Sequence, residues 1–203
     1  MGYFAVILVG YLLGSSNMAY WLSRVRHVDM TTKGTKNLGA SNAAVLLGWH
    51  AGVAVAVHDI GKAVIAVLLA KLLFPMLPYA PAAAGVAAVR GHIFPFYLKF
   101  RGGKGLASFL GLTLGLNWKL ALAVCVILVV VTLVTDYIVL GTVCVTVPMP
   151  IGLFLMTGSL IMVMVVCVAS AVILYKHREN YVRIWNRTEI GRRVTIKGEN
   201  KIK

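Results

Sequence analysis

Acidic residues are scarce in this chain of 203 residues. Six carboxylates stand against 20 lysines and arginines, which gives a formal net charge of +14. Between residues 30 and 178 the only carboxylates are Asp59 and Asp136. A soluble surface needs more charge than this, and the 60% hydrophobic content exceeds the roughly half-apolar average of soluble domains. The composition therefore excludes an ordinary soluble domain and predicts one integral membrane domain.

Cysteines are also few, and they lack the spacing of a metal site or a disulfide. Cys125, Cys144 and Cys167 all lie within apolar runs. We interpret them as inert buried or lipid-facing residues. No metal and no cofactor are expected. The basic excess does not require nucleic acid as a partner, because the anionic lipids of a membrane surface attract the same charges.

Apolar stretches predict an all-α, polytopic membrane protein with about seven transmembrane helices. Prolines, glycines or Asn117 separate several of them. The stretches cover residues 3–22, 45–74, 79–98, 106–116, 120–135, 137–149 and 152–175. The count falls to five if residues 106–135 form one bent span and residues 137–175 form another.

The distribution of positive charge predicts the orientation of these helices. Lysine and arginine concentrate in residues 24–36, in residues 99–104 and in the C-terminal tail, whereas the turns at residues 75–78 and 148–150 carry no charge. The positive-inside rule then places all three basic regions in the cytoplasm. We expect an external N-terminus and a cytoplasmic C-terminus. Residues 1–190 are predicted to form a single membrane domain and residues 191–203 a basic cytoplasmic tail.

A polar loop at residues 34–42 is the first candidate site. Its potential ligand-binding residues are Thr35, Asn37, Gly39, Ser41 and Asn42. Glycines let backbone N–H groups turn toward a phosphate, and hydroxyl and amide side chains add donors. The alternative is a plain polar turn in which Ser41 or Asn42 caps the next helix.

A glycine-rich segment at residues 91–105 is the stronger candidate. It contains His92 and ends in Gly102-Gly103-Lys104-Gly105 directly before an apolar stretch. A lysine and free N–H groups at the positive end of a helix suit a phosphate or a developing oxyanion. The spacing does not match a Walker A loop. The alternative is a basic anchor loop, which does not account for the three glycines around Lys104.

Two further pairs of polar residues are candidates. Asp59 and Lys62 are three residues apart and share one face of an apolar helix, as expected of a structural ion pair or of groups facing a cavity. His177 and Asn180 also lie three apart, where the last apolar stretch ends. They are suited to binding a phosphate, although a basic segment that binds anionic lipid has the same composition.

These motifs, in this order, resemble the bacterial acyl-phosphate:glycerol-3-phosphate acyltransferase family, often called PlsY. The resemblance extends from Gly14 to about Glu189. It rests on Gly34-x-x-Asn37-x-Gly39-Ala40-x-Asn42, Asp59-x-x-Lys62, Gly91-His92-x-Phe94-Pro95-x-x-Leu98-Lys99-Phe100-x-Gly102-Gly103-Lys104-Gly105 and His177-Arg178-x-Asn180. It implies a seven-helix fold in the bacterial plasma membrane. The implied reaction transfers a fatty acyl group from acyl-phosphate to the 1-hydroxyl of glycerol 3-phosphate, giving lysophosphatidate for phospholipid synthesis, without a protein nucleophile.

The resemblance also implies roles for individual residues. The catalytic group is Lys104, His177, Asn180 and Thr35, and the substrate-binding group is Asn37, Gly39, Ser41, Asn42, His92, Gly102, Gly103, Gly105 and Thr142. Val45 departs from the family, which has an arginine there that helps to bind the acceptor's phosphate. Because valine cannot replace that contact, a transferase with another hydroxyl acceptor or a non-catalytic relative remains an alternative. A small membrane transporter is a further alternative, suggested by Asp59, Lys62 and Asp136 in apolar surroundings.

Overall fold

Helices make up all the regular secondary structure of residues 1–193, the part of the chain that the computed structural model describes. The predicted all-α class is therefore confirmed for this part, whereas most of the predicted tail, residues 194–203, lies outside it. The elements are α1 (Gly2–Ser15), α2 (Met18–Val25), α3 (Ala40–Leu47), α4 (Trp49–Leu73), α5 (Ala80–Ile93), the 3-10 helix η1 (Phe96–Leu98), α6 (Leu106–Leu116), α7 (Trp118–Thr135), α8 (Ile138–Thr146), α9 (Pro148–Thr157), α10 (Leu160–Lys176) and α11 (Arg178–Trp185).

Helix boundaries differ from the prediction at several places; for example, α1 ends at Ser15, inside the stretch predicted at residues 3–22. The stretch at residues 45–74 is interrupted at Gly48, which has a φ of 93° and separates α3 from α4. The predicted turn at residues 148–150 is wrong. Pro148 instead begins α9, where a proline costs little because the first helical N–H groups have no partner within the helix. The chain turns at Gly158, whose φ of 63° favours glycine.

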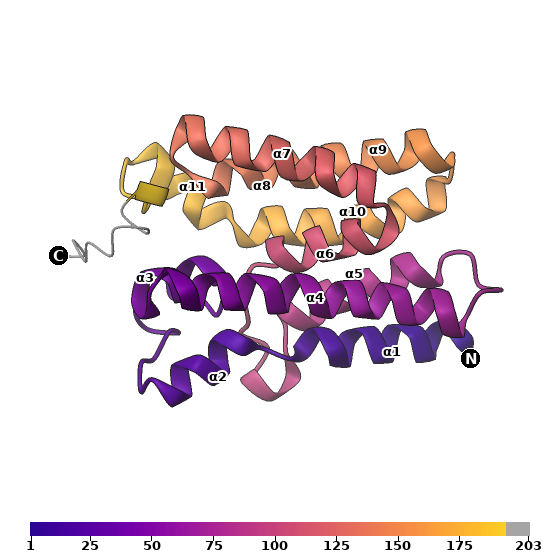
Figure 1. Cartoon of the computed structure of the whole chain (residues 1–203), viewed down its shortest axis with the longest axis horizontal. Coiled ribbons are helices and arrows are strands. Elements are labelled where there is room, and N and C mark those ends of the chain that lie inside the picture. The colour runs from indigo at the N-terminus through magenta and orange to yellow at the C-terminus, as the bar shows by residue number, and fades with distance from the viewer. Residues whose placement is uncertain (194–203) are drawn as a thin grey trace.

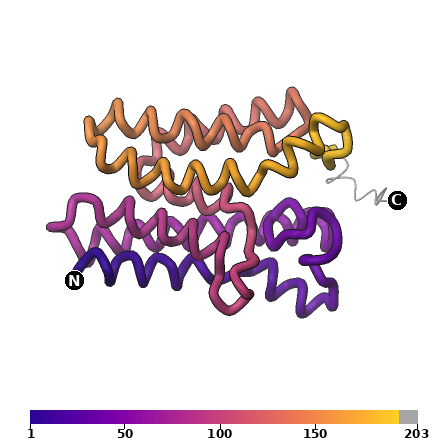
Figure 2. Tube along the Cα trace, turned by 180° about the vertical axis from the view of Figure 1, so that it is seen from behind, coloured from indigo at the N-terminus to yellow at the C-terminus, as the bar shows by residue number. Residues whose placement is uncertain are grey.

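The helices form two layers with α6 between them. Figure 1 shows α1, α4 and α5 in one layer and α7 to α10 in the other, and the view from behind in Figure 2 agrees. Gly10 and Gly14 let α1 approach α5 closely, since a Cβ at either position would overlap the backbone of Ala84 or Ala88. Small residues at such crossings permit the close backbone packing that holds membrane helices together.

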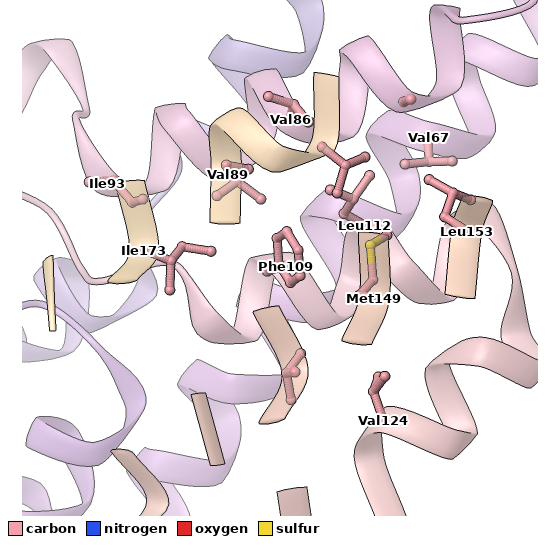
Figure 3. Packing of buried hydrophobic residues seen from close by; sticks show 14 of the residues in the cluster. Val67, Val86, Val89, Ile93, Phe109, Leu112, Val124, Met149, Leu153 and Ile173 are labelled. Carbon is pink, nitrogen blue, oxygen red and sulfur yellow. The ribbon is translucent and has the colours of Figure 1, made fainter. Parts of the chain in front are cut away.

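The central core lies around α6. Phe109 and Leu112 of α6 are completely buried, as are Val67 of α4 and Met149 of α9 (Figure 3). The packing of these side chains joins the two layers. Because the α6 backbone is fixed from both sides, the loop directly before it is held in a defined position.

Several helical segments are long and apolar enough to cross a membrane. Four qualify within the described residues: Gly2–Val25, Trp49–Leu73, Trp118–Thr135 and Ile138–Thr157. A fifth is added if α10 and α11, which are bent by 44°, count as one segment. α5 and α6 are shorter, at 14 and 11 residues. Large apolar side chains remain exposed on the outer helices, for example Val134 and Leu155, both 79% exposed.

Candidate functional site

The Gly-Gly-Lys-Gly segment forms a tight loop against the end of α5. The Gly102 N–H donates to Ile93 O at 3.1 Å and the Gly103 N–H donates to His92 O at 3.2 Å. A Cβ on Gly102 would overlap His92 O, and one on Gly103 would overlap the His92 ring. The loop therefore needs these glycines for close packing, and it holds Lys104 two residues before α6 begins.

The Lys104 ammonium is connected to α11 through a chain of polar contacts. Its Nζ donates to Asn180 Oδ1, and Asn180 Nδ2 donates to Glu189 Oε1 at 2.6 Å. Arg183 Nε donates to the other oxygen of Glu189, also at 2.6 Å. Glu189 is nearly fully buried. Lys104 and Asn180, two of the predicted catalytic residues, are thus brought together, and Glu189 holds the Asn180 amide with its oxygen toward the lysine.

Burial changes the acidity of Lys104. Removal from water, reinforced by the positive charge of Arg183, lowers the pKa of the Lys104 ammonium to about 8. The side chain is therefore charged below pH 8 and increasingly neutral above it. A bound anion stabilises the charged form and raises this pKa again.

His177 and Thr142 present polar groups from the second layer of helices. The Nδ1 of His177 lies 2.8 Å from Ile173 O, and because a carbonyl only accepts, Nδ1 carries the hydrogen. This leaves Nε2 for another partner. Thr142 is completely buried on α8, and its hydroxyl has no hydrogen-bond partner within residues 1–193. Such an unpaired hydroxyl is available to a ligand.

Asn42 organises the polar loop at residues 34–42. This fully buried amide accepts from the Thr35 N–H at 2.8 Å and donates to Met30 O and Asn37 O, both at 2.9 Å. The predicted capping role of Ser41 or Asn42 is wrong, because α3 begins at Ala40 with Gly39 as its N-cap. Asn42 supports the loop, whereas Thr35 and Asn37 line the cavities described next.

Two adjoining cavities lie between these loops. The larger, which we call the basic cavity, measures about 1120 Å³. Its charged lining residues are Lys36, Lys99, Arg101, Lys104, Lys176, Arg178, Glu179 and Arg183. All three basic regions of the sequence therefore meet there. One carboxylate among seven cations makes this cavity strongly attractive to anions.

The smaller cavity, which we call the inner cavity, measures about 360 Å³ and has mostly apolar walls. Predicted site residues in its lining are Thr35, Asn37, Gly39, Ser41, Asp59, His92, Lys104, Gly105, Thr142, His177 and Asn180. Gly102 and Gly103 line the basic cavity, whereas Asn42 and Lys62 line neither. Thr35, Asn37 and Lys104 line both cavities, so the two predicted loops meet where a polar chamber joins an apolar one.

Asp59 and Lys62 form the expected ion pair at 2.8 Å, and both are buried. Lys62 also donates to Ser16 O at 2.7 Å, and His92 Nδ1 lies 3.3 Å from Asp59 Oδ1. His92 in turn packs against Gly103. The cluster therefore links Ser16, which lies between α1 and α2, with α4, α5 and the loop that carries Lys104.

Sequence comparison identifies the relatives of this chain. The profile of the family described as glycerol-3-phosphate acyltransferase matches residues 4–187. The chain belongs to this family. A glycerol-3-phosphate acyltransferase of Myxococcus xanthus is 36% identical over 187 residues, covering 91% of this chain and 97% of the relative. One from Oceanobacillus iheyensis is 32% identical over 196 residues, covering 93% and 94%.

Solved structures of the glycerol-3-phosphate acyltransferase family show the same fold. The crystal structure of PlsY (YgiH), an integral membrane protein, in its glycerol 3-phosphate form is 29% identical and superposes with a TM-score of 0.88, covering 94% of this chain and 96% of that one. The lysophosphatidic acid form gives a TM-score of 0.85. The chain is accordingly an acyltransferase of this family with the fold of an integral membrane protein.

Sequence reasoning missed Glu189 as a site residue. Glu189 lies beyond the His177–Asn180 motif and reaches back across a turn to contact Asn180 and Arg183. The rarity of acidic residues could have indicated it, because Glu189 is one of six carboxylates in a chain of net charge +14. A buried carboxylate in such a sequence requires a partner, which here is the Asn180–Arg183 pair.

Proposed function

We propose that the chain transfers a fatty acyl group from acyl-phosphate to the 1-hydroxyl of glycerol 3-phosphate. The observation that carries this proposal is the position of Lys104, at the junction of the basic cavity and the inner cavity. Both substrates carry a phosphate, which suits a chamber lined by seven cations. The acyl chain requires apolar walls, which Leu106, Leu110 and Leu128 supply in the inner cavity.

The proposed reaction needs no protein nucleophile. The 1-hydroxyl oxygen forms a bond to the acyl carbonyl carbon, and the bond from that carbon to the phosphate oxygen breaks. Inorganic phosphate leaves and takes the hydroxyl proton, and lysophosphatidate is the other product. Lys104 and the positive N-terminal end of α6 stabilise negative charge on the carbonyl oxygen and on the departing phosphate.

The other predicted residues position the two substrates. Thr35 and Asn37 line both cavities, as Lys104 does. The Asn37 amide donates to Thr35 Oγ1 at 2.8 Å, which leaves the Thr35 hydroxyl hydrogen for a phosphate oxygen. The Nε2 of His177 and the unpaired hydroxyl of Thr142 are suited to the acceptor's hydroxyls. Bringing two bound reactants together in this way replaces a bimolecular encounter by a reaction within one complex.

We further propose seven spans, formed by α1 with α2, α4, α5, α6, α7, α8 with α9, and α10. The basic cavity then opens to the cytoplasm, because the positive-inside rule applies to all three regions that line it. The plasma membrane is the proposed location. An odd number of spans puts the two termini on opposite sides of the membrane. Since the basic regions are cytoplasmic, the N-terminus is external and the C-terminus is cytoplasmic.

A donor and acceptor screen tests the reaction. Purified protein in detergent is given radiolabelled glycerol 3-phosphate with palmitoyl-phosphate, palmitoyl-coenzyme A or a palmitoylated carrier protein. We expect lysophosphatidate and an equal amount of phosphate with the acyl-phosphate alone. Product from another donor contradicts the proposed donor. Phosphate release that requires a different hydroxyl compound contradicts the proposed acceptor.

A further inference from the structure

The segment after α11, residues 188–193, folds back toward the turn between α7 and α8. The Arg192 N–H donates to Asp136 O at 2.7 Å, and the Arg193 N–H donates to Asp136 Oδ1 at 3.2 Å. Gly191 lies close to the Asp136 carboxylate, and a Cβ at this position would require the Asp136 side chain to move. Figure 1 shows α11 beside the end of α7. We call residues 188–193 the C-terminal strap.

The strap covers one side of the inner cavity. Glu189, Ile190 and Arg192 all contribute to its lining. The strap is fixed at both ends, at its start by Thr188 N–H donating to Arg183 O at 2.8 Å and at its far end by Asp136. The position of Arg192 against the cavity is therefore determined by the backbone.

The two arginines of the strap differ in what they face. The side chain of Arg193 is 75% exposed, and Arg193 is not part of either cavity lining. The Arg192 side chain is 32% exposed and lines the inner cavity. Its Nε is buried, lies 3.6 Å from Asp136 Oδ1 and has no hydrogen-bond partner among residues 1–193. A buried guanidinium N–H without an acceptor is costly unless a ligand supplies one.

Among residues 1–193, Lys104 and Arg192 are the two lysine or arginine residues that line the inner cavity. Its two carboxylates are already paired, Asp59 with Lys62 and Glu189 with Arg183. Each substrate of the proposed reaction brings a phosphate dianion. The other six cations of the basic cavity do not line the inner cavity, so Lys104 and Arg192 are the cations that a phosphate contacts on the inner side of the junction. A guanidinium offers five N–H donors in a fixed plane that fits phosphate oxygens.

We propose that Arg192 binds the phosphate group of one of the two substrates, with the C-terminal strap positioning it. This inference rests on the proposed function. The shared chemistry is a terminal phosphate group, which glycerol 3-phosphate carries as an ester and the acyl-phosphate carries as a mixed anhydride. The backbone bonds to Asp136 hold the strap, which leaves the guanidinium in place before substrate enters.

The test compares Arg192→Ala with Arg193→Ala. Each variant removes one arginine from the same strap and the same neighbourhood of Asp136, so they are matched in charge. We expect Arg192→Ala to raise the KM for one phosphate substrate about tenfold or more, as for the loss of a hydrogen bond to a charged group. For Arg193→Ala we expect the KM of both substrates to stay within twofold of the wild-type value. The KM of Arg192→Lys is expected to lie between those of the wild type and Arg192→Ala. The substrate whose KM changes identifies the phosphate that is bound.

Equilibrium binding separates this inference from the proposed reaction. Calorimetric titration with glycerol 3-phosphate and with a non-hydrolysable acyl-phosphonate does not require turnover. Weaker binding of either ligand to Arg192→Ala, with Arg193→Ala unchanged, supports the inference even if the assumed reaction is wrong. If Arg192→Ala does not fold, Arg192→Gln replaces it in this test, because glutamine keeps most of the side-chain volume. If the Arg192 and Arg193 variants have equal KM values and equal affinities, the proposed phosphate binding by Arg192 is overturned, whether or not wild-type turnover is seen.

Discussion

At the scale of single residues, sequence patterns predicted candidate residues that lie close together in the chain, but not the contacts between distant ones. Lys104 is recognisable because three glycines surround it before an apolar helix, and the structure shows that two of them are required by contact with His92. The Lys104–Asn180 contact joins residues 76 apart, and only the family resemblance assigned both to one catalytic group. Glu189 was missed because its role depends on a turn that carries no distinctive pattern.

The lowered pKa of Lys104 predicts the pH dependence of the reaction. The ammonium is the required form, and it deprotonates as the pH rises through about 8. We therefore expect kcat/KM to fall above pH 8 in assays from pH 6.5 to 9.5, because this parameter reports the free enzyme. The corresponding fall in kcat lies at higher pH, since bound anions raise the pKa. A kcat/KM that stays constant or increases across pH 7–9.5 contradicts this role.

At the scale of helices and loops, hydropathy predicted where apolar segments lie but only some of their breaks. Asn117, for example, was expected to separate two stretches and lies between α6 and α7. Pro148 and Pro150 resemble a turn in sequence, yet proline is tolerated at the start of α9. The real turn at Gly158 has only one glycine to mark it. Gly48 lies inside an apolar stretch, and its positive φ becomes visible only when α3 and α4 pack against each other. Tertiary contacts decide such breaks, so the sequence alone does not fix them.

The loop before α6 predicts contrasting effects for two Gly→Ala variants. A Cβ on Gly103 would overlap the His92 ring and lie 2.9 Å from Leu38 O, so Gly103→Ala must displace the loop that carries Lys104. We expect at least a tenfold loss of kcat/KM and a lower melting temperature in detergent. Gly61→Ala on α4 is the control, because nothing lies within 4 Å of its added Cβ. It should keep full activity and gain up to about 1 kcal/mol of stability. Equal activity of the two variants contradicts the packing account.

At the scale of the whole molecule, the distribution of charge predicted which loops lie together, whereas hydropathy did not predict how the helices pack. The three basic regions were expected on one side of the membrane, and they line one cavity. The two-layer arrangement around α6 was not predictable, because apolar helices of similar composition pack in many orders. The shortness of α6 was predicted, because the stretch at residues 106–116 matches its bounds, whereas α5 ends at Ile93, before the predicted end of its stretch at residue 98.

Cysteine labelling in intact cells tests the proposed orientation. After replacement of the three native cysteines by alanine, single cysteines are introduced as Lys36→Cys, Arg101→Cys and Met76→Cys. All three positions are exposed. We expect a membrane-impermeant maleimide to label only the variant at position 76 in intact cells, and all three after permeabilisation. Labelling of position 36 or 101 from outside contradicts a cytoplasmic basic cavity, and opposite results for these two positions exclude a shared site.

The central claim is that Lys104, held where the basic and inner cavities meet, stabilises the charge that develops during acyl transfer. The most direct measurement compares kcat for lysophosphatidate formation in Lys104→Ala and Lys99→Ala. Both changes remove one lysine that lines the basic cavity, but Lys99 is exposed and does not line the inner cavity. We predict that Lys104→Ala lowers kcat by about 100-fold or more, as for loss of an oxyanion donor, with an unchanged melting temperature. Lys99→Ala should stay within about threefold of wild type, and comparable kcat values in the two variants would contradict the account.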